Sequence, residues 1–338
     1  MISQQLHVGR RRNGIERSPW LFVLMMILML VMSACSSEEE PVDSSDFATP
    51  LSNRVDLHQE SEDGGHEHTH LTEDELTGGT RVVMVPSEIA QGPSRFAVGL
   101  FDAQGGLIHD AVVHFHYYDL RDPDQALLLA EVDARRVQDP EGFTTIYAHD
   151  HNFDLVGLWG VEVEARLADG GGARQRLGFE VMADTASLSP GEKAPVLNTL
   201  TLDDVNQNPA RLTTAEEPNL ALHKLSLAQA VNNGRPTLLL LATPAFCQTR
   251  FCGPAYEMVS ELQPRYDDRL NFVYSEVFSA LPDPSANGFQ PSEAMTVFGL
   301  ESEPWVYFID EEGTIVYRLE GLFTAEEIEH ELQTRLGL

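Results

Sequence analysis

The hydrophobic pattern is clearest at residues 237–242, where Thr-Leu-Leu-Leu-Leu-Ala forms an uninterrupted apolar run. A run of this length without alternation is typical of a strand that is buried on both faces in a parallel sheet. A short polar loop with Cys247 and Cys252 follows, and helical spacing of apolar residues then begins at 255. The pattern therefore predicts a strand (237–241), a cysteine loop and a helix (255–262) in succession.

Cys252 lies beside the predicted start of this helix, where Gly253 and Pro254 lead into it. Proline suits the first helical turn because its φ is already helical and its missing N–H needs no partner there. Free N–H groups and the helix dipole stabilise a negative charge at this end and lower the pKa of a thiol. We therefore expect Cys252 to ionise readily, which is the physical requirement for thiol–disulfide chemistry.

Helices and strands alternate around this unit. The predicted helices are 225–233, 292–298 and 324–336, and the further predicted strands are 270–277, 305–309 and 314–318. The last helix begins with Thr324-Ala-Glu-Glu, which is a capping-box sequence. This order of elements predicts an α/β domain over residues 190–338.

Residues 80–185 have a different pattern, in which short alternating segments are separated by turn sequences such as Asp-Pro-Glu-Gly at 139–142. Strands at this spacing predict a seven-stranded β-sandwich. The predicted strands are 81–85, 95–101, 111–118, 126–132, 144–148, 159–167 and 176–181.

Two short segments of this region, Phe101-Asp-Ala-Gln-Gly-Gly before Ala111-Val-Val, and Gly157-Leu-Trp-Gly-Val-Glu-Val, resemble the YtkA/FixH-like family of immunoglobulin-type extracytoplasmic domains. That resemblance implies an all-β immunoglobulin-like sandwich and no enzymatic residues.

Four histidines of this region are candidate metal ligands. His114 and His116 share one face of the predicted strand 111–118, and His149 and His151 flank Asp150 after another strand. If the two strands are neighbours, the four imidazoles converge on a metal ion such as Cu²⁺ or Zn²⁺. The alternative is a solvated sheet face.

A cluster of arginines within the first 17 residues precedes an apolar run at 20–32, which is short for a membrane span and right for a signal peptide. The run ends in Val-Met-Ser-Ala-Cys35, which resembles a bacterial lipobox. The resemblance implies cleavage after residue 34, lipid attachment to Cys35 and, from Ser36, sorting to an outer membrane where one exists. An uncleaved anchor and an ordinary secretory signal are the alternatives. Each would place the chain outside the cytoplasm, where disulfides persist.

Residues 35–79 are acidic and nearly free of aromatic side chains, so we expect a disordered tether. His66, His68 and His70 lie within it beside carboxylates. They could hold Zn²⁺ or Cu²⁺ loosely, or simply form a soluble polar tract.

The formal net charge of −31 excludes nucleic acid as a plausible partner, because such a surface repels phosphates. With Cys35 assigned to the lipid anchor, Cys247 and Cys252 are the possible partners for each other.

Several motifs of the last 145 or so residues resemble the thioredoxin-like superfamily. They are Lys193-Ala-Pro195, Cys252-Gly-Pro-Ala, the segment Phe298-Gly-Leu-Glu-Ser-Glu-Pro304-Trp-Val-Tyr-Phe-Ile, and Gly321 before the last helix. The resemblance implies that Pro304 is cis and lies against the sulfurs, where it presents main-chain groups to a bound partner. The chain is thus expected to hold a sandwich followed by an α/β thioredoxin-like fold.

The cysteine spacing departs from this family, since Cys-x-x-x-x-Cys replaces Cys-x-x-Cys. Cys252 is the expected nucleophile and Cys247 the resolving thiol, although the roles could be exchanged. No carboxylate occurs between 237 and 251, so the family's buried acid is missing from that segment. Arg250 would lower a nearby thiol pKa and Glu303 would raise it.

The function expected from these features is a membrane-anchored thiol–disulfide oxidoreductase of the cell envelope, which acts on protein thiols or disulfides and requires no cofactor. Three alternatives stay open. They are a peroxiredoxin-like peroxidase, because Thr249-x-x-Cys252 resembles that family's motif, a copper metallochaperone resembling Sco proteins, and a binding lipoprotein with a structural disulfide.

Overall fold

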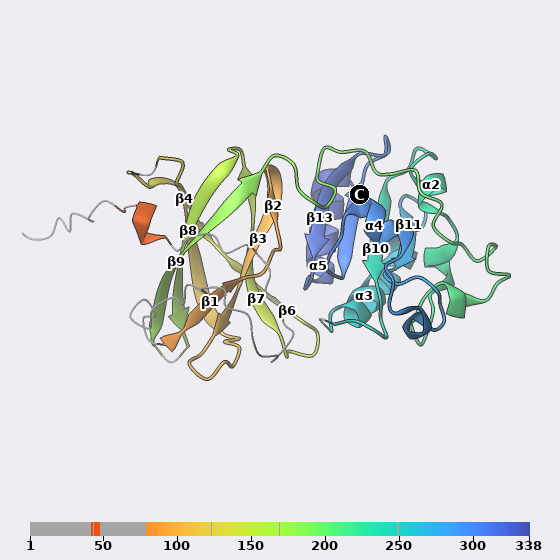
Figure 1. Ribbon diagram of the computed structural model, residues 1–338, viewed down its shortest axis with the longest axis horizontal. Coiled ribbons are helices and arrows are strands. Elements are labelled where there is room, and N and C mark those ends of the chain that lie inside the picture. The colour runs from red at the N-terminus through yellow and green to blue at the C-terminus, as the bar shows by residue number, and fades with distance from the viewer. Residues whose placement is uncertain (1–41, 43, 48–78, 123, 169, 249) are drawn as a thin grey trace, which may run out of the picture. The chain divides into compact units, whose positions relative to one another are not determined.

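The computed structural model describes residues 42, 44–47, 79–122, 124–168, 170–248 and 250–338. The three sheets within these residues belong to one compact unit that begins at Val42 (Figure 1). The expected signal peptide, Cys35, the tether histidines His66, His68 and His70, and Thr249 lie outside the described residues. Among the described helices, none has both the length and the apolar character that a membrane span needs.

Two antiparallel-rich sheets form the predicted β-sandwich. One sheet has the order β1 (Arg81–Met84), β3 (Gly92–Phe101), β7 (Thr145–Phe153) and β6 (Arg135–Gln138). The other has the order β2 (Ile89–Ala90), β9 (Gly172–Met182), β8 (Gly157–Leu167), β4 (Ala111–Asp119) and β5 (Leu127–Asp133). All seven predicted strands are present. The short strands β2 and β6 were not predicted, because neither is long enough to show a period of two.

Aromatic side chains fill the space between these two sheets. On β4, Phe115 and Tyr117 are buried among them while the intervening His116 faces the other way, as the alternation of a strand requires. The ring of Phe96 meets those of Phe115 and Tyr117 edge to face, at centroid distances of 5.3 and 5.7 Å. Burying each such ring contributes about 1.5–3 kcal/mol, so this layer is a main source of the sandwich's stability.

The C-terminal sheet has the order β11 (Asn271–Glu276), β10 (Thr237–Ala242), β12 (Trp305–Ile309) and β13 (Ile315–Glu320). β10 pairs parallel with β11 and antiparallel with β12. Figure 1 shows the α-helices of the described residues gathered around this sheet.

Helices cover both faces of the C-terminal sheet. Leu238 and Leu240 of β10 pack with α3 (Cys252–Tyr266) and α5 (Ala325–Leu336). Leu239 and Leu241 pack with α2 (Leu227–Ala230) and α4 (Glu293–Phe298). Because each side of β10 meets a helical layer, every residue of the strand is buried, which explains the unbroken apolar run in the sequence.

Helix boundaries differ from the predicted ones at two places. The helix expected at 225–233 is only the short α2, which starts with a capping box at Ser226 and is followed by Gly234 with φ +73°. α3 begins at Cys252 rather than at 255, so Pro254 lies within its first turn. The capping box expected at Thr324 and Glu327 is present at the start of α5.

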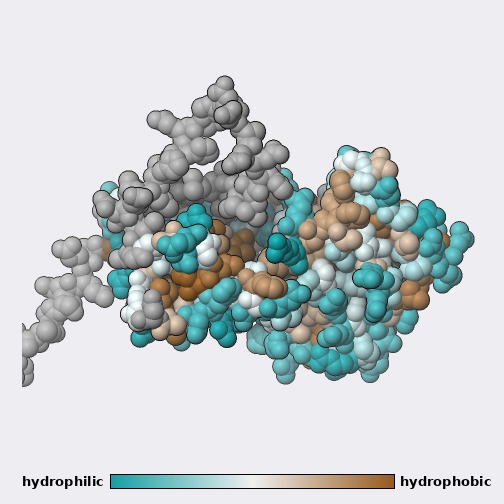
Figure 2. All heavy atoms as spheres, turned by 90° about the horizontal axis from the view of Figure 1, so that it is seen from below, coloured by the Kyte–Doolittle hydropathy of each residue, from teal (hydrophilic) through white to brown (hydrophobic). Residues whose placement is uncertain are grey.

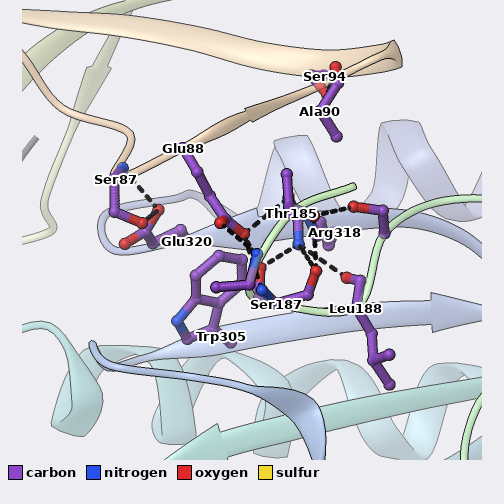
Figure 3. A network of polar contacts seen from close by, with 12 residues as sticks. Ser87, Glu88, Ala90, Ser94, Thr185, Ser187, Leu188, Trp305, Arg318 and Glu320 are labelled. Carbon is purple, nitrogen blue, oxygen red and sulfur yellow. Dashed lines mark hydrogen bonds and ion pairs between the residues drawn. The ribbon is translucent and has the colours of Figure 1, made fainter. Parts of the chain in front are cut away.

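A buried polar network joins the segment before β2 to the C-terminal sheet (Figure 3). The Glu88 carboxylate accepts hydrogen bonds from the N–H groups of Ala186 and Ser187, at 3.0 and 3.1 Å, and forms an ion pair with Arg318 at 3.3 Å. The Arg318 guanidinium also donates to the carbonyl of Leu188 at 2.8 Å and lies over the Trp305 ring. Each buried charge in this network therefore has several partners, as burial demands.

Candidate functional site

The cysteine loop brings both sulfurs to the N-terminus of α3. The Cys252 N–H, the first of the helix, donates to Cys247 Sγ at 3.2 Å. The two Sγ atoms and a carboxylate oxygen of Glu303 all lie within 4.8 Å of one another. Both cysteines carry thiols. A Cys-x-x-x-x-Cys spacing across a strand–loop–helix turn thus places the two sulfurs side by side.

Cys252 is not the readily ionised thiol that the sequence predicts. Its side chain is 0% exposed, and burial raises the pKa of the thiol far above its ordinary value. The neighbouring Cys247 and the Glu303 carboxylate raise this pKa further, and a backbone hydrogen bond at Thr243 lowers it only in part. The prediction was wrong because desolvation of a fully buried sulfur outweighs the helix dipole.

Cys247 is the more accessible of the two sulfurs, since its side chain is only partly buried. The helix N–H that was expected to favour a charge on Cys252 points instead at Cys247 Sγ. An N–H donor and the positive end of a helix both favour a thiolate at the sulfur that accepts the bond. The geometry therefore favours ionisation of Cys247 over Cys252.

Glu303 supplies a buried carboxylate beside the sulfurs. It is 8% exposed, accepts a hydrogen bond from the Gln248 N–H at 3.0 Å, and precedes Pro304 through a cis peptide bond. Burial raises the pKa of this carboxyl, and the charge of Cys247 raises it further. The expectation that Glu303 would raise a thiol pKa is confirmed at Cys252.

The predicted supporting residues lie around the helix start. Gly253 and Pro254 form the first turn of α3. Arg250 is exposed and has φ +69° in the left-handed region. The causes of the Cys252 pKa shift are burial, Cys247, Thr243 and Glu303, so Arg250 is not among them; its predicted effect on a thiol stays a prediction for Cys247.

A second buried acid, Glu276, lies at the end of β11 opposite Ala242. It accepts hydrogen bonds from the Tyr274 hydroxyl and the Thr214 N–H, both at 2.9 Å, and burial raises the pKa of its carboxyl. The sequence analysis missed Glu276 because it considered acids only between residues 237 and 251. The sequence did offer a signal, since Glu276 lies near the end of the predicted strand 270–277.

The sandwich histidines do not converge, so the predicted four-imidazole metal site is wrong. β4 and β7 belong to different sheets. His114 instead pairs with Asp133 of β5 at 2.6 Å, and His116 lies 3.4 Å from Glu131. These two residues match the alternative interpretation, a solvated sheet face.

His149 and His151 face the core of the sandwich. Their ring centroids are 5.8 Å apart, and the His151 ring stacks on Tyr117 at 4.4 Å. Burial lowers the pKa of His149, and burial together with His149 lowers the pKa of His151 to about 4. Both are therefore neutral core side chains at neutral pH.

Comparison with known proteins gives little further information. No protein-family model matches the sequence, and a search of curated proteins finds no match. Several solved structures show limited likeness, including the following three. CopC from Methylosinus trichosporium OB3b is 16% identical over 30% of this chain and 93% of its own, with a TM-score of 0.21. The PmoD soluble domain from Methylocystis sp. ATCC 49242 is 14% identical over 30% and 90%, with a TM-score of 0.20. MtrC from Shewanella baltica OS185 is 12% identical over 44% and 28%, with a TM-score of 0.25. Scores this low support no argument about function.

Proposed function

We propose that residues 190–338 form a thioredoxin-like domain in which Cys247 and Cys252 exchange a disulfide with client proteins. The observation that supports this most directly is the hydrogen bond from the Cys252 N–H to Cys247 Sγ, with both sulfurs within 4.8 Å of each other and of Glu303. One sulfur is accessible and favoured as a thiolate, while the other is buried behind it. A working dithiol needs this asymmetry, because only one sulfur should react first with the client.

The roles are the reverse of those expected from the sequence. The Cys247 thiolate attacks one sulfur of a client disulfide and forms a mixed disulfide, and the other client sulfur leaves as a thiolate with the electron pair of the broken bond. Cys252 then loses its proton, attacks Cys247 Sγ and releases the second client thiolate. The client gains two electrons, and the Cys247–Cys252 pair becomes a disulfide. Both steps reverse when the disulfide form meets a client dithiol.

Glu303 is the group placed to receive the proton that Cys252 must lose. Its carboxylate lies in the same cluster as the two sulfurs, and its raised pKa brings it closer to that of a thiol. The charge of Cys247 is a smaller cause of that raised pKa, and the mixed disulfide removes it, which lowers the pKa of Glu303 in part. Burial is the largest cause and stays in place, so it still favours proton uptake at that step.

The site of action that best fits the chain is the cell envelope. The signal-like N-terminus and the lipobox resemblance at Cys35 support a lipid-anchored protein that faces away from the cytoplasm, in the outer membrane of a Gram-negative cell. Thiol–disulfide exchange suits that compartment, since disulfides form and persist there. The face drawn in Figure 2 is mixed, with hydrophilic (teal) residues surrounding several hydrophobic (brown) patches.

Single cysteine variants test both the function and the assignment of roles. In Cys252→Ser, a mixed disulfide with a model client should accumulate on Cys247, because the resolving sulfur is missing. In Cys247→Ser no adduct should form, because Cys252 is buried. An adduct on Cys252 in the second variant would restore the assignment made from the sequence.

Failure of exchange would also be informative. If neither variant traps a client and the wild type does not reduce insulin, a binding lipoprotein with a structural disulfide is the better account. Rapid consumption of hydrogen peroxide in place of disulfide exchange would favour the peroxiredoxin-like alternative.

A further inference from the structure

The sulfurs of Cys247 and Cys252 and the carboxylate of Glu303 come from two separate parts of the chain. The cysteines lie in the loop after β10 and at the start of α3, and Glu303 lies just before β12. Since β12 pairs with β10 along its whole length, the sheet itself fixes the carboxylate opposite the cysteine loop. Among the described residues, this is the only group of three His, Cys, Asp or Glu side chains whose ligand atoms all lie within 4.8 Å of one another.

Three groups that become anions on losing a proton are thus crowded into a mostly buried space. Burial penalises each separate charge, and each charge opposes the next. Binding a cation reverses both effects, because a coordinated thiol ionises outright and the metal charge offsets those of its ligands.

We propose that the reduced protein binds one thiophilic d¹⁰ cation, such as Zn²⁺, through Cys247 Sγ, Cys252 Sγ and the Glu303 carboxylate.

The donor set selects this class of ion. Two thiolates favour zinc-like and soft ions over Mg²⁺ or Ca²⁺, which take oxygen ligands. In a tetrahedral zinc site the Zn–S distance is about 2.3 Å and the Zn–O distance about 2.0–2.2 Å, which places two sulfur ligands roughly 3.8 Å apart. The three donor atoms, now within 4.8 Å, need to approach by no more than about 1 Å.

The site would be open at one position. Three protein ligands leave the fourth position of a tetrahedral ion to water or to an incoming ligand. Cys247 is partly exposed and so provides the side from which the ion enters.

Metal and disulfide would exclude each other, since both require the same two sulfurs. Binding releases protons from the thiols and involves no electron transfer, so the cation would hold the pair in the dithiol form. The inference does not depend on the proposed exchange activity, because the same cluster can bind a cation whether or not a client reaches it.

The test is an anaerobic titration of the reduced full-length protein with Co²⁺, followed by displacement with Zn²⁺. One equivalent of Co²⁺ should give a thiolate-to-cobalt charge-transfer absorption that Zn²⁺ abolishes. The band should be absent from protein oxidised to the Cys247–Cys252 disulfide and from Cys247→Ser. Replacing His66, His68 and His70 together by Ala should leave it unchanged, which separates this site from the histidine tract.

Glu303→Gln identifies the third ligand. It keeps the size of the side chain and removes the charge, so the Zn²⁺ affinity should fall by about tenfold or more. Glu257→Gln, the same change at an exposed position of α3, should leave the affinity unchanged. Absence of the charge-transfer band in the reduced wild type, or equal Zn²⁺ affinity of Glu303→Gln and wild type, would overturn the proposal. Disulfide exchange without metal binding would overturn this inference and leave the proposed function standing. Metal binding without disulfide exchange would overturn the proposed function and leave this inference standing.

Discussion

A buried histidine beside the C-terminal sheet predicts a specific loss of stability in acid. His223 ends the short helix η5 (Leu220–His223), is 1% exposed, and packs edge to face on Tyr274 at a centroid distance of 5.2 Å. Neither of its ring nitrogens has a hydrogen-bond partner among the described residues. Burial lowers the pKa of His223 from 6.5 to about 4.

The sign and size follow from proton linkage. Below pH 6.5 the unfolded chain binds a proton at His223, and the folded protein does not bind it until the pH approaches 4. Stability is therefore lost as the pH falls through this window. Each pH unit within it contributes about 1.4 kcal/mol, so acidification from pH 7.5 to 5.0 should cost about 2 kcal/mol through this residue alone.

The assay is urea unfolding at pH 7.5 and 5.0, with wild type compared with His223→Phe. The variant keeps the aromatic contact with Tyr274 but cannot bind a proton, so its stability should depend less on pH by about 2 kcal/mol over this range. His330→Phe, the same substitution at an exposed position of α5, should show the wild-type pH dependence. Equal losses of stability in wild type and His223→Phe would refute the reasoning.

Three further predictions concern the site, the buried polar network and the core. Glu303→Gln should lower the pKa of the Cys252 thiol, because the carboxylate charge raises it. The check is the pH dependence of Cys252 alkylation under mild denaturant, compared in Cys247→Ser with and without Glu303→Gln. Glu88→Ala leaves Arg318, a buried guanidinium, without its carboxylate and should reduce the free energy of unfolding by about 3–5 kcal/mol. Leu240→Ala empties space on the α3 face of β10 and should cost about 2–5 kcal/mol, as urea unfolding would report.

Strand and helix positions in this protein could be predicted well wherever packing is periodic. The apolar run of β10 and the alternation in β4 each reflect a regular burial pattern, so their limits agree with the structure within a residue or two. The two-residue strand β2 could not be predicted, because its pairing with β9 depends on the fold of the sandwich and not on a local period.

The chemistry of the site was only partly predictable. That the two cysteines come together follows from the strand–loop–helix order. Which sulfur is buried was missed because the predicted helix began at 255. α3 begins at Cys252, and the helical period then places Cys252 on the buried face with Ala255, Tyr256 and Val259. The sequence places Glu276 near the end of a predicted strand, but its position opposite Ala242 depends on the parallel pairing of β10 with β11, which brings residues 34 positions apart into register.

The histidine prediction failed for a related reason. Spacing places His114 with His116, and His149 with His151, but it gives no information about which strands are neighbours. β4 pairs with β5 and β8, whereas β7 pairs with β3 and β6. The sheet assignment decides that His114 and His116 face outward beside acidic residues, whereas His149 and His151 face inward against Tyr117.

The reduction potential of the Cys247–Cys252 pair, measured by equilibration against glutathione buffers and thiol trapping, tests the exchange function most directly. A working couple should have a potential above about −300 mV, and the accessible sulfur should be the one that carries glutathione in the mixed species. A potential below that value would contradict the account, and so would a failure of Cys247 and Cys252 to form a disulfide with each other.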